Sequence, residues 1–494
     1  MLKGITRRFF LGGLGSSVSG AAWAAGLDAS LRPRLRPARI AGGGPGAAEA
    51  LVSEALPGGT VAYAVADART GEMLENRLAD VGLPPASVTK TITALYALDN
   101  LGAEYRFATR LIAEGKISDG VLDGDLVLAG GGDPTLDTRA LADLAAALKA
   151  TGLREVRGRF MVWAGALPYA RQIDPAQPAH VGYNPAVCGL ALNFNRVHFE
   201  WKRSGGKYGV SMDARAGRYR PEVEVAQMDV VDRGGPVYTY HDKGGVDHWT
   251  VARGALGNGG ARWLPVRRPE LYAADVFRTL ARAHGIELPR ETLADAPPQG
   301  AEIARHRSDE LRVIVQEMLK YSNNLVAEMV GMSASVARAG QPVGMRASAG
   351  VMSRWAEVEL GMHDAGLVDH SGLGDGSRLQ AADMVRALAL SRVKKALQPL
   401  LKTMPMRNSN SGNSNEITVQ AKTGTLNFVS GLAGYIERKG QRELAFAVFS
   451  ADMPRRTTIP RAQRERPRGA RPWNRRARRL QRKLIERWDR LYSA

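Results

Sequence analysis

The pattern of apolar residues changes twice along the chain, and this change constrains the fold. Residues 60–74 predict a β-hairpin, and an apolar helix is expected to begin at Ser87. Helical spacing returns at 308–338, and three apolar segments between 417 and 449 predict strands. Residues 106–300 are instead richer in Gly, Asp and short apolar runs, which predicts a separate, mainly β region. The 494 residues therefore indicate an α/β core that is interrupted by a long insertion.

The positive charge of the chain is concentrated at its two ends. The sequence has 68 Lys and Arg against 49 Asp and Glu, a net charge of +19. Residues 451–494 hold fifteen of the basic residues and only four acids, so they carry more than half of this excess. Because the long middle of the chain is only weakly basic, composition does not support a nucleic-acid-binding protein.

The basic C-terminal segment has the pattern of an amphipathic helix. Its apolar residues recur at steps of three and four. They are Trp473, Ala477, Leu480, Leu484, Trp488 and Leu491. We expect this stripe to pack on a core and the arginines to face solvent. The alternative is peripheral contact of the arginines with a membrane or an anionic wall polymer.

The N-terminus is typical of a twin-arginine export signal. Arg7 and Arg8 precede an uncharged stretch, residues 9–27, and Ala22-Trp23-Ala24 supplies a small-x-small cleavage site. A transmembrane anchor is the alternative, but the many Gly and Ser residues disfavour it. We expect a signal peptide over 1–24, a linker over 25–46 and a periplasmic mature protein.

The sequence predicts neither disulfides nor a metal site. Cys188 is the single cysteine, and we expect it to be a small buried side chain. The eight histidines include no closely spaced ligand set, so no cofactor is expected.

A Ser-x-x-Lys pattern occurs at Ser87–Lys90, Ser204–Lys207 and Ser391–Lys394. The second lies in a glycine-rich loop and the third inside an ordinary helical stretch. Ser87 instead opens a helix, where residues i and i+3 share a face and free N–H groups surround the hydroxyl. A serine in this position can become a nucleophile if burial lowers the pKa of the neighbouring lysine.

Two later motifs complete a set that serine acyltransferases use. Ser322-Asn323-Asn324 lies between two helices, and Lys422-Thr423-Gly424-Thr425 ends a strand. The order Ser-x-x-Lys, Ser-x-Asn, Lys-Thr-Gly is that of β-lactamases and penicillin-binding proteins. A cation and hydroxyl groups beside the nucleophile also suit a substrate with a free carboxylate.

The chain resembles the low-molecular-mass class C penicillin-binding proteins, the D-alanyl-D-alanine carboxypeptidase/endopeptidase family. Three further segments resemble stretches of that family: Gly124–Leu136, Leu190–Asn195 and Asp369–Leu373, the last with His370 in place of glycine. The resemblance implies a penicillin-recognising serine transpeptidase/β-lactamase-like domain, an antiparallel sheet flanked by helices, with a large, mainly β insertion. Residues 47–105 and 301–494 would form this domain, and 106–300 would be inserted.

The resemblance also implies an activity, serine D-alanyl-D-alanine carboxypeptidase cleavage of peptidoglycan stem peptides, with β-lactams as covalent inhibitors. Endopeptidase cleavage of cross-links is the additional activity that the resemblance leaves open. Ser87 would attack the penultimate D-alanine carbonyl while Lys90 takes its proton. Ser322 would relay a proton to the leaving group, and Asn324 would hold the acyl chain. On the strand that binds the substrate, Lys422 would keep the site electropositive, Thr423 and Thr425 would engage the terminal carboxylate, and Gly424 would lie between them. The backbone N–H groups of Ser87 and Thr425 would form the oxyanion hole.

Two other functions remain open on the sequence. One is a β-lactamase or esterase on the same fold, which the long insertion disfavours. The other is a non-catalytic cell-wall-binding protein, which the complete set of motif side chains disfavours. We expect His370 to be structural and Asp133 to shape a turn.

Overall fold

The computed structural model describes residues 45–406 and 417–493. The predicted signal peptide, 1–24, and the linker up to residue 44 lie outside the described residues. Helix α1 (Pro45–Ala55) begins within the last two residues of the expected linker. Within the described ranges, no helix has the length and apolar character needed to cross a membrane.

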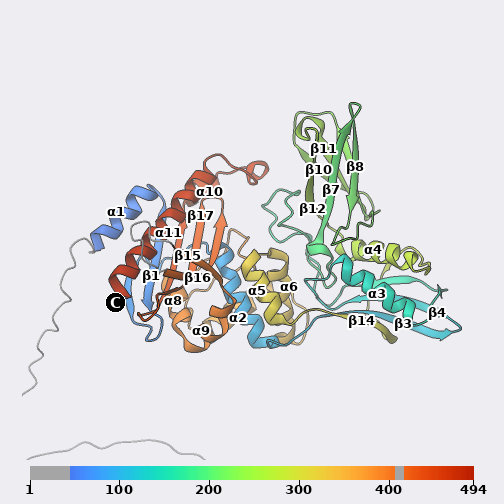
Figure 1. Cartoon of the computed structure of the whole chain (residues 1–494), viewed down its shortest axis with the longest axis horizontal. Coiled ribbons are helices and arrows are strands. Elements are labelled where there is room, and N and C mark those ends of the chain that lie inside the picture. Colours follow the sequence, from blue (N-terminus) through green and yellow to red (C-terminus); the bar gives the residue numbers. More distant parts are fainter. Residues whose placement is uncertain (1–44, 407–416, 494) are drawn as a thin grey trace, which may run out of the picture. The chain divides into compact units, whose positions relative to one another are not determined.

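Six antiparallel strands form the main sheet, in the order β15-β16-β17-β18-β1-β2 (Figure 1). Their bounds are β1 (Thr60–Asp67), β2 (Met73–Arg77), β15 (Lys402–Met406), β16 (Ile417–Leu426), β17 (Val429–Glu437) and β18 (Leu444–Ala451). The predicted hairpin and the three predicted C-terminal strands are confirmed. Because β1 pairs with β18, the sheet joins the two parts of the chain that flank the insertion.

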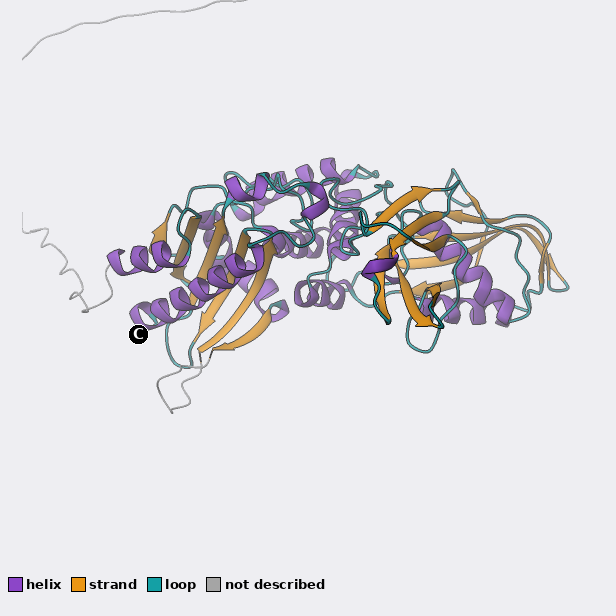
Figure 2. Cartoon of the chain, turned by 90° about the horizontal axis from the view of Figure 1, so that it is seen from above, coloured by secondary structure: helices purple, strands orange, loops and turns teal. Residues whose placement is uncertain are grey.

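The two faces of this sheet are covered by different helices (Figures 1 and 2). Side chains alternate between faces along a strand. Val61 and Val65 of β1 therefore belong to a core with α1 and the C-terminal helix α11 (Ala470–Tyr492), whereas Ala62 and Ala64 belong to a core with α2 and α8. Both faces are apolar, which explains why β18 is buried along its whole length.

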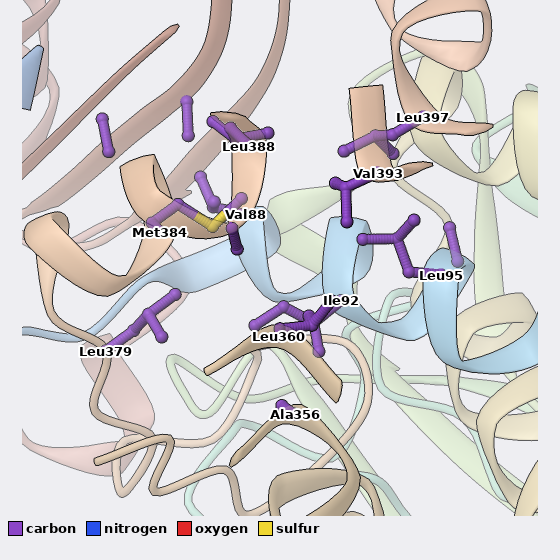
Figure 3. Close-up of a cluster of buried hydrophobic side chains, with 14 of the residues drawn as sticks. Val88, Ile92, Leu95, Ala356, Leu360, Leu379, Met384, Leu388, Val393 and Leu397 are labelled. Atoms are coloured by element: carbon purple, nitrogen blue, oxygen red, sulfur yellow. The ribbon is translucent and has the colours of Figure 1, made fainter. Parts of the chain in front are cut away.

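The helical face holds the start of the Ser-x-x-Lys helix. The short 3-10 helix η1 (Ala86–Val88) leads into α2 (Thr89–Leu101). Figure 3 shows Val88, Ile92 and Leu95, which are spaced by four and three residues, within one apolar cluster. The helices around them are α5 (Leu311–Tyr321), α6 (Asn324–Ala339), α7 (Met345–Leu360), α8 (Ala381–Ala389), α9 (Ser391–Leu397) and η4 (Gln398–Leu400).

The C-terminal helix packs as its sequence pattern predicts. Trp473, Leu480 and Trp488 are fully or almost fully buried, and Leu491 is half-buried. Arg479 lies on the exposed face. Two short helices, α10 (Met453–Thr457) and η5 (Arg461–Gln463), connect β18 to α11.

The insertion consists mainly of strands around its own apolar core, as expected. One sheet has the order β13-β6-β4-β3-β14, and two three-stranded sheets have the orders β12-β7-β8 and β10-β11-β9. The strands are β3 (Ala108–Ser118), β4 (Val121–Gly130), β5 (Glu155–Val156), β6 (Phe160–Trp163), β7 (Arg196–Ser204), β8 (Lys207–Asp213), β9 (Ala226–Val231), β10 (Tyr238–Asp242), β11 (Asp247–Ala252), β12 (Gly259–Pro265), β13 (Thr292–Leu293) and β14 (Ala301–Arg307). The helical elements are α3 (Thr138–Ala150), η2 (Asn193–Asn195), η3 (Arg253–Ala255) and α4 (Pro269–Ala283). Because β14 pairs with β3, this sheet extends beyond residue 300, where we expected the insertion to end.

Candidate active site

Ser87 lies in a tight turn that neighbouring glycines hold in place. Ala86, just before it, has a φ of 49°, which is rare for a residue with a side chain. Gly372, itself at a φ of 74°, approaches this turn so closely that a Cβ there would lie 1.8 Å from the Ala86 carbonyl oxygen. A Cβ at Gly424 would lie 2.6 Å from the carbonyl oxygen of Pro85. The Lys-Thr-Gly strand and the 369–373 segment therefore fix where the Ser87 hydroxyl is presented.

Lys90 is fully buried beside this hydroxyl. Its Nζ lies 3.0 Å from Ser87 Oγ, 2.8 Å from Asn324 Oδ1 and 2.7 Å from the carbonyl oxygen of Ser371. A protonated amine donates to all three. When it is neutral, its lone pair has to face a partner that carries a proton, and of these three atoms only the Ser87 hydroxyl does. The geometry therefore allows neutral Lys90 to accept the proton of Ser87.

The surroundings of Lys90 favour its neutral form. Burial, followed by the nearby charge of Lys422, lowers the pKa of Lys90 to about 7, against the opposing effect of Asp369 and Glu328. A lysine whose pKa lies near neutral pH is suited to general-base catalysis.

A second serine–lysine pair, Ser322 and Lys422, forms in the same site. Ser322 ends α5 in the left-handed conformation, with φ 60°, and its Oγ accepts a hydrogen bond of 2.9 Å from Lys422 Nζ. Lys422 also donates to the backbone oxygen of Thr423 at 2.8 Å. Burial, followed by the charge of Lys402, lowers the pKa of Lys422 to about 8. Lys422 and Ser322 can thus exchange a proton within hydrogen-bond distance.

Residues of all three motifs line one cavity of about 330 Å³, and the buried Lys90 and Lys422 lie behind its wall. Ser87, Ser322, Asn324 and Thr425 contribute to its wall, whereas the exposed Thr423 does not. The structure thus brings together residues from all three motifs. Lys90 and Asn324, which share a hydrogen bond, are 234 positions apart in the sequence.

A buried carboxylate that the sequence analysis missed supports this arrangement. Glu328 on α6 accepts the backbone N–H groups of His370 at 3.0 Å and Ser371 at 2.9 Å. Burial, followed by the negative charge of Asp369, raises the pKa of Glu328 to about 8. Glu328 stands four residues after Asn324, so the two share one helix face. That spacing was the available signal in the sequence.

Sequence reasoning also missed the residues that complete the cavity wall. Tyr183 comes from the insertion, and Arg456, Arg464 and Glu465 come from the segment before α11. Arg456 and Arg464 both form ion pairs with Asp375. No local pattern marks these residues, because they meet only through tertiary packing.

The other two Ser-x-x-Lys pairs lie elsewhere. Ser204 and Lys207 are exposed at the turn between β7 and β8. Ser391 begins α9, and Lys394 forms an ion pair with Glu443. Neither serine lines the cavity of Ser87.

The residues expected to be structural make structural contacts. His370 is fully buried, and its Nε2 lies 2.8 Å from Ser348 Oγ. Burial lowers the pKa of His370 to about 3, so its imidazole is neutral. Asp133 accepts the backbone N–H and the hydroxyl of Thr135, as in a turn. Cys188 is buried.

One group of metal-type donors occurs among the described residues, within the insertion. His198, Glu200 and Asp213 place one potential ligand atom each within 4.8 Å of one another. Arg215 already donates to both carboxylates at 2.7 Å. This guanidinium offsets part of the negative charge of the two carboxylates and already occupies the hydrogen-bonding position beside them.

The fold and this site define the class of penicillin-recognising serine hydrolases. The model of the D-Ala-D-Ala carboxypeptidase 3 (S13) family matches residues 47–466, and the chain belongs to that family. It is therefore a serine-type D-Ala-D-Ala carboxypeptidase, and the resemblance seen in its motifs is confirmed.

Individual relatives extend over most of the chain. It is 30% identical over 428 residues to the D-alanyl-D-alanine carboxypeptidase of Actinomadura sp. (strain R39), which covers 81% of this chain and 79% of the relative. Its fold is similar to penicillin binding protein 4 (dacB) from Haemophilus influenzae, with a TM-score of 0.72 at 20% identity over 90% of this chain and 99% of the other. A second structure of that protein, complexed with a β-lactam, has a TM-score of 0.69.

Proposed function

We propose that this carboxypeptidase acts on peptidoglycan stem peptides through an acyl-enzyme on Ser87. The observation that carries the proposal is the position of Lys90 Nζ, 3.0 Å from Ser87 Oγ, with the serine hydroxyl as the one partner able to donate to a neutral amine. Lys90 takes the proton while Ser87 Oγ attacks the carbonyl carbon of the penultimate D-alanine. The backbone N–H groups of Ser87 and Thr425 stabilise the oxyanion.

The second serine–lysine pair serves the leaving group. Ser322 Oγ delivers a proton to the departing nitrogen of D-alanine and is resupplied from Lys90 or Lys422. The C–N bond breaks, and the acyl group stays on Ser87. Water then attacks the ester with help from a basic lysine, which releases the peptide and restores the Ser87 hydroxyl.

Substrate binding uses the end of β16 and the amide of Asn324. Protonated Lys422, together with Thr423 and Thr425, binds the terminal carboxylate, while Gly424 lets the strand approach Ser87 closely. Asn324 Nδ2 donates to the Tyr183 carbonyl at 3.0 Å. Its second N–H is available for a carbonyl of the acyl chain.

The same site would react with β-lactams, because they present a strained amide and a carboxylate to the same groups. Cleavage of D-alanyl cross-links, the endopeptidase reaction, requires the same chemistry with a larger leaving group. The N-terminal Arg7-Arg8 pattern supports twin-arginine export to the periplasm. The exposed arginines of α11 support peripheral contact with an anionic membrane or wall polymer.

Labelling with a fluorescent penicillin tests the nucleophile. We expect the parent chain to be labelled covalently and Ser87→Ala to lose the label. Ser391→Ala is the matched control, because it removes the serine of another Ser-x-x-Lys pair outside the cavity. Equal labelling of Ser87→Ala and the parent would overturn the assignment. Release of D-alanine from a pentapeptide, followed by product analysis on purified muropeptides, then tests the substrate.

A further inference from the structure

A second cavity adjoins the active site on the far side of Ser322. It has a volume of about 550 Å³ and shares Tyr183, Ser322 and Asn324 with the cavity that holds Ser87. Ser87 and Thr425 do not line it. A cavity of this size suits a ligand considerably larger than a single alanine.

The wall of this second cavity is formed by the peptidase core and by the insertion. Helices α5 and α6 supply apolar side chains such as Ile314, Met318 and Val326. From the insertion come Phe194 and Arg196, the latter at the start of β7. The cavity is therefore apolar over much of its surface and carries one guanidinium.

Arg196 is a mostly buried cation without a partner anion. Its guanidinium lies over the rings of Phe194 and Trp263, 5.4 and 5.6 Å from the ring centroids. Its Nε is buried and has no hydrogen-bond partner, and no ion pair of Arg196 occurs among the described residues. Burial lowers the pKa of Arg196, which reflects the cost of holding this charge out of water.

The one acidic residue that lines the same cavity does not compensate this charge. Glu317 forms an ion pair with Lys320, at 3.3 Å, on the exposed side of α5. A buried guanidinium is stabilised by an anion that accepts two parallel hydrogen bonds, and a carboxylate has that geometry.

We propose that Arg196 binds a carboxylate on the leaving-group side of the substrate, in the cavity that begins at Ser322. The proposal rests on the proposed function, in which Ser322 protonates the leaving nitrogen. Asn324, which holds the acyl chain, also lines this cavity, but Ser87 and Thr425, which hold the acyl carbonyl, do not. We therefore assign a group bound there to the leaving amino acid. The ligand class is an acidic peptide or amino acid larger than D-alanine, such as the second stem peptide of a cross-link.

A matched pair of substrates tests this assignment. Both peptides have diacetyl-L-lysyl-D-alanine as the acyl part and a D-2-aminopimelic acid residue as the leaving group. In one peptide the side-chain carboxylate of this residue is free, and in the other it is replaced by a carboxamide. We expect the parent to prefer the carboxylate, measured as the ratio of the two kcat/KM values. Because a hydrogen bond to a charged group is worth about a ten-fold to hundred-fold change in binding, Arg196→Met should lower this ratio by about that factor.

Controls separate charge recognition from packing. Methionine keeps an unbranched apolar side chain between the two rings, and Arg196→Lys, which keeps the charge, should retain part of the preference. Arg203→Met is the matched control: Arg203 lies on the same strand over a tyrosine ring, 5.9 Å from its centroid, and lines neither cavity. Melting temperature and penicillin labelling establish that each variant is folded.

The outcomes distinguish the inference from the function on which it rests. The role of Arg196 would be overturned if Arg196→Met left the ratio of the two kcat/KM values unchanged, including the case in which both kcat/KM values fell by the same factor. The enzyme would remain a carboxypeptidase in either case. If the parent released neither leaving group and Ser87 took no penicillin label, the proposed function would fall, and the inference with it.

Discussion

Glu328 supports Lys90 through the backbone of a single residue, Ser371. The Glu328 carboxylate accepts the Ser371 N–H at 2.9 Å, and the Ser371 carbonyl oxygen accepts a hydrogen bond from Lys90 Nζ at 2.7 Å. The carboxylate thus positions an acceptor for the lysine without touching the Ser87 hydroxyl. Because both groups are buried, the arrangement is held by packing and little affected by solvent.

Replacing Glu328 by Gln should slow acylation by about ten-fold or more, because the amide nitrogen cannot accept one of the two backbone N–H groups. We expect the acidic limb of the pH–rate profile to move to lower pH as well, because the ionised form of Glu328 raises the pKa of Lys90 and Gln has no such form. Penicillin acylation rates measured across pH check both effects. Glu357→Gln, on the exposed face of α7, is the control and should behave like the parent. If Glu328→Gln slowed acylation but left the pH–rate profile unchanged, Glu328 would not act through Lys90.

The two lysines predict a bell-shaped pH dependence of D-alanine release. Below about pH 7 Lys90 is protonated and cannot accept the serine proton, so kcat/KM should rise through its pKa of about 7. Above about pH 8 Lys422 loses its charge, so binding of the terminal carboxylate should weaken. Measuring kcat/KM from about pH 5 to about pH 10 checks this shape.

Substitution of each lysine separates the two limbs. Lys422→Arg keeps its charge throughout this range, so the alkaline limb should disappear while the acidic limb remains. Lys90→Arg cannot act as a base and should lower the rate by about a hundred-fold or more. An alkaline limb that persists in Lys422→Arg would show that another group titrates.

Gly372→Ala should disrupt the turn that presents Ser87. The new Cβ would lie 1.8 Å from the Ala86 carbonyl oxygen, so the turn has to move. We expect loss of penicillin labelling and a decrease of about 2 kcal/mol or more in the free energy of unfolding. Chemical denaturation followed by labelling measures both.

Gly361→Ala is the matched control for this substitution. Gly361 has a similar φ of 65°, but nothing lies within 4 Å of its added Cβ. The Gly361→Ala variant should lose only about 1 kcal/mol of its free energy of unfolding through backbone strain, and it should still be labelled by penicillin. Equal effects at both positions would mean that strain, and not the contact with Ala86, is responsible.

The C-terminal helix should be necessary for folding. Trp488 is fully buried and contacts Tyr63 and Phe446, at ring-centroid distances of 5.5 and 6.1 Å. Trp488→Ala should therefore cost about 3–5 kcal/mol, and truncation after Ser450 should unfold the protein. Arg479→Ala, on the exposed face, should change stability by less than about 0.5 kcal/mol. A truncated chain with normal melting and activity would show that the helix is an accessory.

The sequence by itself determined the elements and the motif residues. The hairpin at 60–74, the strands near the C-terminus and the stripe of α11 all follow from local periodicity, which depends only on neighbouring residues. The order of the three motifs, and the helix start at Ser87, separated this serine from the two other Ser-x-x-Lys pairs before any contact was known.

Only the tertiary structure decided which distant groups meet. Tyr183, Arg456 and Arg196 carry no local signal, because their positions depend on how the insertion and the C-terminal segment pack against the sheet and helices. The lowered pKa of Lys90 is likewise a property of burial and of its charged neighbours, which a sequence position does not specify. Local patterns record short-range constraints, whereas a buried site depends on contacts between segments that are hundreds of residues apart.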